Sequence, residues 1–312
     1  MSQGARSGVM LLVVTSVLWG TTGTAASFAQ GVSPLAIGAV SLGVGGLLQG
    51  AIALGAIRAA RQALRAHRRT VIVGALGVAV YPLAFYSSMD LGGVALGTVI
   101  SLGSAPIASG VLERVVDGVR LTSRWWCAAV LGIAGCALLG SAEAAQSGQA
   151  GGISVASSVA LGLLAGASYA AYSWSAGRLM SAGLPRRAAM GSVFAAGGLL
   201  LLPVLLALGA PLLATTQNVL VATYLALIPM FVGYVLFGVA LSRVPASTAT
   251  TVTLLEPAVA AMLAVLVVGE HVTIPGWVGM ALIAAGLLVL VAVPHRAAPP
   301  PRPARSSGPH VV

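Results

Sequence analysis

Long apolar runs follow one another along almost the whole chain, and this pattern limits the fold more than any other feature of the sequence. A helix needs roughly 20 mostly apolar residues to cross a lipid bilayer, and ten runs bounded by charges, prolines or glycine clusters come near that length. The first five lie near 8–29, 34–56, 70–89, 94–112 and 124–141. The second five lie near 153–176, 188–208, 219–241, 246–268 and 275–293. The sequence therefore predicts an all-α membrane protein with ten transmembrane helices.

The composition excludes several other classes of protein. Of the 312 residues, 58% are hydrophobic and only 7% are charged, a balance that a water-soluble domain of this size does not carry. The formal net charge of +10 is divided among the segments between the apolar runs, so no basic face for nucleic acid is predicted. Cys127 and Cys136 fall in one apolar run, too far apart along a helix for a local disulfide and too few for a metal site. We expect neither nucleic acid nor metal as a partner.

The arginines predict how the chain is oriented. All sixteen basic residues are arginine, and with ten spans each of them lies at a terminus or in every second loop, on one side of the membrane. Cytoplasmic loops collect basic residues, so both termini are predicted to be cytoplasmic in a multi-pass protein of the cell membrane. The loops on the opposite side contain no arginine and hold Asp90, Glu143, Glu270 and His271.

The two halves of the chain are similar to each other. A shift of 151 residues aligns 94–139 with 245–290 without a gap and gives eleven identities, against roughly five expected by chance in a sequence so rich in Ala, Gly, Leu and Val. The identities include a shared tryptophan and a shared proline, Pro106 and Pro257. Because each copy has an odd number of helices, five, the second copy enters the membrane from the opposite side and the repeat is inverted.

The predicted organisation is two five-helix repeats with short flanking segments. Residues 1–7 form a cytoplasmic N-terminus, 8–141 the first repeat, 142–152 an external linker, 153–293 the second repeat and 294–312 a tail. The tail is proline-rich, polar and basic, and we expect it to be disordered in the cytoplasm. Two inverted halves can exchange conformations, so that a central site opens alternately to the two sides of the membrane.

Several segments resemble one transporter family. The stretch LEPAVAAMLAVLVVGEHVTIPGWVGMALIAAGLLVL resembles the C-terminal signature of EamA-type members of the drug/metabolite transporter superfamily, and SAPIASGVLERVVDGVRLTSRWWCAAVLGIAGCALL is a weaker copy of it. The early LWGTTGTAASFAQGVSPLAIGAV resembles the first two helices of the family. The similarity extends to Val293. This sequence departs from the pattern at Ala105, where the second copy has Glu256, and at Glu113 and Arg114, which interrupt a usually apolar stretch.

The resemblance implies ten helices, no cofactor, and export of amino acids, related small metabolites or drugs. It does not imply a particular substrate, because the signature is shared across specificities. The motif GxxxxGK[ST] is absent from the sequence, so direct use of ATP is not expected.

Glu256 and Pro257 are the leading site candidates. Glu256 lies near the middle of its span, and an ionised group at the bilayer centre costs at least about 2.5 kcal/mol on insertion scales, so it normally faces a cavity or a partner. Pro257 removes a backbone donor and frees the carbonyl near Thr253, which predicts a kink or hinge there and, in the other copy, at Pro106. Glu256 either lines the transport path and exchanges a proton, or stays protonated and pins the kink by a hydrogen bond to a neighbouring helix.

Aromatic residues are candidates for lining the same substrate or proton pathway. They are Trp19, Tyr81, Tyr86, Tyr169, Tyr172 and Tyr234. The alternative for each is packing or a place in the interfacial belt. A single carboxyl group and no fixed cation in the membrane interior favour a zwitterionic, neutral or cationic small molecule as the substrate.

Two other classes of function remain as alternatives to transport. A membrane sensor or interaction protein would leave the repeat unexplained. An intramembrane enzyme is the least favoured, because the four histidines lie in loops or the tail and neither HExxH nor GxSxG occurs. The expected partners are a small-molecule substrate and the lipid bilayer. Small-residue spacings such as Gly162 and Gly166 favour packing within the chain over a homodimer, which they still permit.

Overall fold

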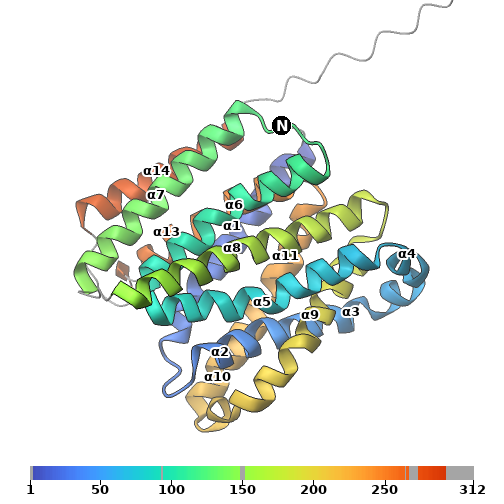
Figure 1. The fold of residues 1–312 in the computed structure, drawn as a ribbon, viewed down its shortest axis with the longest axis horizontal. Helices are drawn as coiled ribbons and strands as arrows, with labels where there is room; N and C mark the ends of the chain where they lie inside the picture. Colours follow the sequence, from blue (N-terminus) through green and yellow to red (C-terminus); the bar gives the residue numbers. More distant parts are fainter. Residues whose placement is uncertain (1–2, 93, 148–151, 264, 267–272, 293–312) are drawn as a thin grey trace, which may run out of the picture.

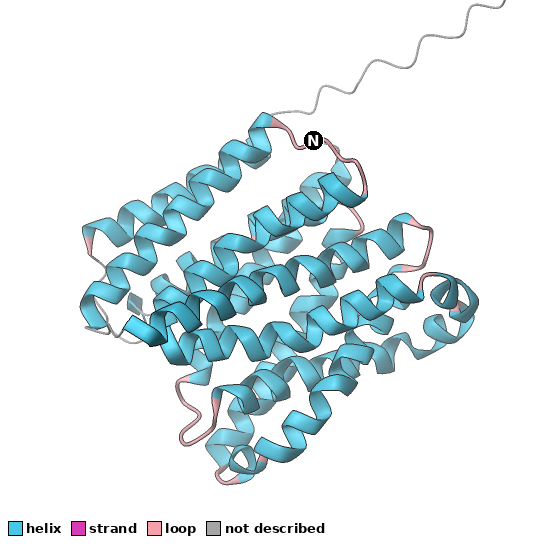
Figure 2. Ribbon diagram, in the orientation of Figure 1, coloured by secondary structure: helices cyan, strands magenta, loops and turns pink. Residues whose placement is uncertain are grey.

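The computed structural model describes residues 3–92, 94–147, 152–263, 265–266 and 273–292. This part of the chain folds into helices joined by short loops and contains no strand (Figure 2). The predicted all-α class is therefore confirmed for the described residues. Residues 148–151 of the predicted linker, Val293 and the whole predicted tail, 294–312, lie outside them.

Seven helices and one π-helical segment lie between Gln3 and Ser147. They are α1 (Gln3–Ala26), α2 (Pro34–Gly38), the π-helical η1 (Ala39–Val44), α3 (Gly45–Ala59), α4 (Arg61–Ala66), α5 (Arg68–Gly92), α6 (Val94–Val116) and α7 (Ser123–Ser147). The segments α2, η1 and α3 follow one another without a gap, and Ser33 begins them by accepting a hydrogen bond from the backbone N–H of Ala36 at 3.2 Å. Ser33 thereby satisfies one of the donors that a helix start leaves free.

The second part of the chain repeats this pattern of long helices. Its elements are α8 (Gly152–Ser181), α9 (Arg186–Leu208), the 3₁₀ turn η2 (Ala210–Leu213), α10 (Thr216–Leu225), the π-helical η3 (Ala226–Val232), α11 (Gly233–Leu241), α12 (Ala246–Val252), α13 (Leu255–Leu263) and α14 (Ile274–Ala292). The π-helical segment η3 contains Pro229, whose missing N–H is a common cause of such a local change in winding.

Eight helical segments are long and apolar enough to cross a membrane. They are Gln3–Ala26, Pro34–Ala59, Arg68–Gly92, Gly97–Val116, Ser123–Ser141, Arg186–Leu208, Thr216–Leu241 and Ala246–Leu263. The segment Ile274–Leu290 is apolar but shorter, and α8, although 30 residues long, lies outside the eight. A multi-pass membrane protein is thus confirmed, while the count of ten spans stays a prediction.

The helices pack in pairs that join the two parts of the chain. Along one edge of the molecule α7 lies beside α14, and elsewhere α3 packs on α9, α8 on α5 and α6, and α1 on α11 and α13 (Figure 1). The predicted packing role of Gly162 and Gly166 is confirmed: a Cβ added at Gly162 would lie 2.9 Å from Ile100, and one at Gly166 would lie 2.6 Å from the carbonyl oxygen of Ser101. Both glycines face α6 of the same chain, where a larger residue would force the helices apart.

Candidate functional site

The apolar run that carries Glu256 is broken in its middle. Helix α12 ends at Val252 and α13 begins at Leu255, so the break falls just before Pro257. Proline offers no N–H to the carbonyl four residues earlier, and the Thr253 carbonyl accepts a hydrogen bond from the N–H of Glu256 instead, at 3.0 Å. The helix is thus interrupted at residues 253–254, where the sequence predicts an opening; a hinge motion at Pro257 stays a prediction.

Pro106 has a different outcome in the other half of the chain. It lies inside α6, which runs from Val94 to Val116 as one helix. Of the two matched prolines, only Pro257 adjoins an interruption of its helix, and a kink or hinge at Pro106 stays a prediction.

Glu256 lies in the first turn of α13 and lines a small cavity. Its side chain is 8% exposed, and within the described residues its carboxyl group has no hydrogen bond or ion pair. The cavity lining consists of Trp19, Thr22, Ser41, Leu42, Tyr81, Pro82, Phe85, Tyr86, Met230, Tyr234 and Glu256. The cavity volume is about 20 Å³, room for about one water molecule. In this conformation the site is closed to an organic molecule.

Four of the six predicted pathway aromatics line this cavity together with Glu256. Trp19, Tyr81, Tyr86 and Tyr234 come from α1, α5 and α11. The indole N–H of Trp19 donates to the carbonyl of Pro229 at 2.9 Å, and the Trp19 and Tyr234 rings lie 4.7 Å apart between centroids. The indole is thereby held in position, and it presents an aromatic surface to the cavity.

The other two, Tyr169 and Tyr172, lie behind the cavity wall on α8. The hydroxyl of Tyr169 forms a hydrogen bond of 2.8 Å with the hydroxyl of Thr253 at the helix break. The hydroxyl of Tyr172 bonds that of Tyr234 at 2.6 Å. Tyr169 therefore bonds a residue of the break, and Tyr172 bonds Tyr234 of the cavity lining. Neither of them is part of the lining itself.

The sequence did not single out several residues of this site. Phe85 is on the cavity wall, and Phe194 and Phe237 pack against Tyr234 with centroid distances of 4.6 and 5.8 Å. Thr22 and Ser41 supply the hydroxyl groups of the lining. Small hydroxyl residues and single phenylalanines are frequent in apolar helices, so nothing in the local sequence separates these five from their neighbours.

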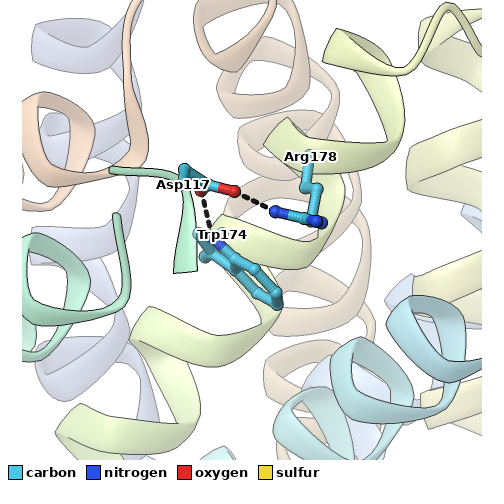
Figure 3. A network of polar contacts seen from close by, with 3 residues as sticks. All are labelled: Asp117, Trp174 and Arg178. Carbon is cyan, nitrogen blue, oxygen red and sulfur yellow. Dashed lines mark hydrogen bonds and ion pairs between the residues drawn. The ribbon is translucent and has the colours of Figure 1, made fainter. Parts of the chain in front are cut away.

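A separate polar network lies just after the end of α6, and none of its residues lines the cavity. The Trp174 indole N–H donates to an Asp117 carboxylate oxygen at 2.6 Å, and Arg178 forms an ion pair with the same carboxylate (Figure 3). The Arg178 guanidinium carbon also lies 5.2 Å from the Trp174 ring centroid. Trp174 therefore belongs to a helix-end contact and not to the cavity.

The described residues contain no group of three or more His, Cys, Asp or Glu side chains that could hold a metal ion. Cys127 and Cys136 are free thiols. The chemistry that the cavity offers is that of one carboxyl group, two hydroxyl groups, tyrosine hydroxyls and aromatic faces.

Comparison with known proteins identifies a family. The EamA-like transporter family matches the chain in two segments, residues 6–141 and 156–292. An uncharacterized transporter of Bacillus subtilis (strain 168), YwfM, is 35% identical over 293 residues, which cover 92% of this chain and 94% of the relative. An uncharacterized transporter of Clostridium kluyveri is 34% identical over 95 residues, 30% of each chain.

A solved structure has the same fold. A crystal structure of a protein superimposes with a TM-score of 0.73 and covers 92% of this chain and 97% of its own, at 20% sequence identity. At this identity the likeness concerns the fold alone. With the family match over both segments and a relative that is similar along nearly its full length, the chain belongs to the EamA-like transporter family.

Proposed function

We propose that this protein is a secondary transporter that exports small organic metabolites, such as amino acids or related compounds, across the cell membrane by alternating access. The observation that carries the proposal is the position of Glu256: a buried carboxyl group, without a partner among the described residues, on the wall of a cavity at a helix break. Such a group in a membrane interior marks a substrate or ion pathway by default.

The absence of a hydrogen bond favours the pathway role of Glu256 over the structural one. A carboxyl group that only pinned the kink would be bonded to a neighbouring helix, because an unpaired buried polar group is costly. At the break itself, the side-chain hydrogen bonds are made by other residues: the Thr253 hydroxyl bonds that of Tyr169, and the Cys136 thiol donates to the Leu254 carbonyl. The carboxyl group of Glu256 lines the cavity, where it can bind a substrate group or exchange a proton.

The packing supports two inverted five-helix halves and hence ten spans. A shift of 151 residues turns the pair α5–α8 into the pair α11–α1, and α6–α8 into α13–α1, and all four pairs are in contact. The matched helices α7 and α14 pack antiparallel, because Arg124 at the start of α7 bonds the Val289 carbonyl near the end of α14. An axis in the membrane plane produces this arrangement, with both termini on the arginine-rich, cytoplasmic side.

The cavity lining favours a zwitterionic, neutral or cationic substrate. It contains one carboxyl group and aromatic faces, and no arginine or histidine is among its residues. Aromatic faces and a carboxylate both attract an ammonium group. A cavity of about 20 Å³ cannot admit such a molecule, so the halves move relative to each other during transport, and a proton on Glu256 is the coupling ion that the site offers.

Counterflow in proteoliposomes tests this function. Purified protein is reconstituted into vesicles preloaded with an unlabelled solute, and uptake of the labelled solute is followed for amino acids, their analogues and cationic drugs. A growth or toxicity screen of an overexpressing strain selects the solutes. Transient accumulation of at least one labelled solute, absent from protein-free vesicles, is expected. If preloaded vesicles exchange none of the solutes that the screen selects, the proposed function is wrong.

A further inference from the structure

Glu113 is a second buried carboxyl group, outside the cavity. The sequence pattern places the end of its span near 112, but α6 continues to Val116, so Glu113 is helical and 5% exposed. Its carboxylate accepts a hydrogen bond from the backbone N–H of Ser247 at 3.2 Å and another from the Ser247 hydroxyl at 2.5 Å. Ser247 is the second residue of α12. The contact therefore joins α6 of the first half to the broken helix of the second half.

Other charged side chains join the two halves at the same end of the molecule. This end, called the arginine-rich end below, is the one at which α7 starts and α14 ends. Here Arg124 donates to the Val289 carbonyl at 2.8 Å, and Asp117 pairs with Arg178. The start of α1 lies at this end too, since Arg243, just before α12, donates to Ser7 at 2.9 Å.

At the opposite end, among the described residues, two neutral side chains of α10 join the halves. There the Gln217 side chain donates to the Phe28 carbonyl at 3.0 Å and the Asn218 side chain to the Gln30 carbonyl at 3.1 Å. Under the 151-residue shift Glu113 and Ser247 correspond to an alanine and a leucine. The sequence thus supplies no charged counterpart of the Glu113–Ser247 contact in the mirrored position.

Helix α12 links this contact to the cavity. It has only seven residues, a length of about 10 Å at the α-helical rise. Glu113 holds its first turn, while Thr253, directly after its last residue, is bonded to Tyr169 and accepts from Glu256. A short rigid helix cannot shift at one end without moving the other, so displacement of Ser247 displaces the backbone that positions Glu256.

We propose that Glu113 is a positioning residue that keeps the cavity closed toward the arginine-rich end by holding the start of α12, and that this contact opens when the cavity opens to that side. The inference rests on the proposed alternating access. Among the polar contacts at this end described above, Glu113 is the best placed for the role, because it is buried and accepts two hydrogen bonds from α12, whereas the exposed Asp117–Arg178 pair is screened by water and contributes little.

Cysteine accessibility tests the proposal without any substrate. A Thr22→Cys reporter on the cavity wall is introduced after Cys127→Ala and Cys136→Ala, which remove both native thiols, and a membrane-impermeant maleimide is applied to right-side-out or inside-out vesicles. Glu113→Gln is expected to raise the labelling rate from the arginine-rich face about tenfold, because one of the two oxygens that accept from Ser247 is replaced by a donor, and to lower it from the other face. The exposed contact provides the matched control: Asp117→Asn is expected to change neither rate more than about twofold.

Ser247→Ala completes the design. It removes the hydroxyl donor and keeps the backbone N–H, so we expect a smaller rise than with Glu113→Gln, and no further rise in the double variant, because both changes break one contact. Unchanged labelling of both single variants would overturn the proposal. An equal rise of the labelling rate from both faces would also overturn it, because that result would mean that the whole protein is less tightly packed. Labelling needs no transported solute, so these results stay informative even if counterflow fails. If Glu113→Gln does not elute as a monodisperse species, Ser247→Ala alone decides.

Discussion

Two helices of this protein carry the same proline and respond to it in opposite ways. Helix α6 passes through Pro106 without interruption, whereas the matched helix is divided into α12 and α13 just before Pro257. The residues around the break differ accordingly: Ala105 stands beside Pro106, and Glu256 beside Pro257. A proline therefore permits a break in a membrane helix but does not impose one.

At the break, neighbouring groups supply hydrogen-bond partners to Thr253. At the second site the Thr253 carbonyl takes the N–H of Glu256, and the Thr253 hydroxyl bonds Tyr169 of a neighbouring helix. Inside a membrane each such group needs a partner. A break is thus maintained where neighbouring residues supply partners, and in this protein it coincides with the cavity carboxyl group.

The largest effect is expected from the acid that only one of the two helices has. Glu256→Gln keeps the size and hydrogen-bonding capacity of the side chain and removes its titration, so uptake driven by a pH gradient is expected to fall to the level of protein-free vesicles. The measurement is initial uptake in proteoliposomes with an imposed pH gradient. Retained pH-driven uptake would remove Glu256 from proton coupling. Solute counterflow by the same variant, which needs no gradient, shows whether binding survives.

Replacing the proline at the break is expected to have the next largest effect. In Pro257→Ala the new N–H can bond the Thr253 carbonyl, and removal of proline from a helix interior favours the continuous helix by about 3 kcal/mol. The opposing Tyr169 hydrogen bond contributes only about 1 kcal/mol, so the helix is expected to close. The transport rate should fall by about tenfold or more, because Glu256 is then displaced, while the thermal unfolding temperature rises. A variant with both values unchanged would contradict this account of the break.

The break and its acid could both be predicted from the local sequence. Pro257 acts on its own helix through a missing N–H, so the opening near Thr253 follows from local chemistry. Glu256 stands out because an acid is rare in such a run. The class of fold follows in the same way, from long apolar segments and alternating arginine loops.

What depends on contacts between distant helices could not be predicted. The six aromatic candidates were recognisable as a group, but which four face the cavity is decided by how α1, α5, α8 and α11 pack. Glu113 was noticeable as a departure from an apolar pattern, yet its partner Ser247 is 134 residues away. No local signal connects two residues at that separation.

Removing the hydrogen bond that supports the break is expected to have an intermediate effect. Tyr169→Phe leaves the ring in place and removes the bond to Thr253, a loss of about 1 kcal/mol in the free energy of unfolding. We expect a small decrease in thermal stability and a decrease of a few-fold in transport rate. Tyr224→Phe is the matched control, because it removes a tyrosine bond, to Thr21 at 2.7 Å, that involves neither the break nor a residue of the cavity lining. If both variants lower transport equally, the Thr253 contact has no special role.

The smallest effect is expected at the proline that breaks nothing. Because α6 is already helical on both sides of Pro106, Pro106→Ala adds a donor for the Leu102 carbonyl without changing the path of the chain. The expected result is higher thermal stability, because a proline in a helix interior is about 3 kcal/mol less favourable than alanine, and a transport rate within about twofold of the parent protein, because the path of α6 does not change. Initial uptake rates of Pro106→Ala and Pro257→Ala, measured side by side, decide the comparison. An equal loss in both would mean that α6 also bends open during transport, and that the two halves exchange roles at their prolines although only one of them carries the acid.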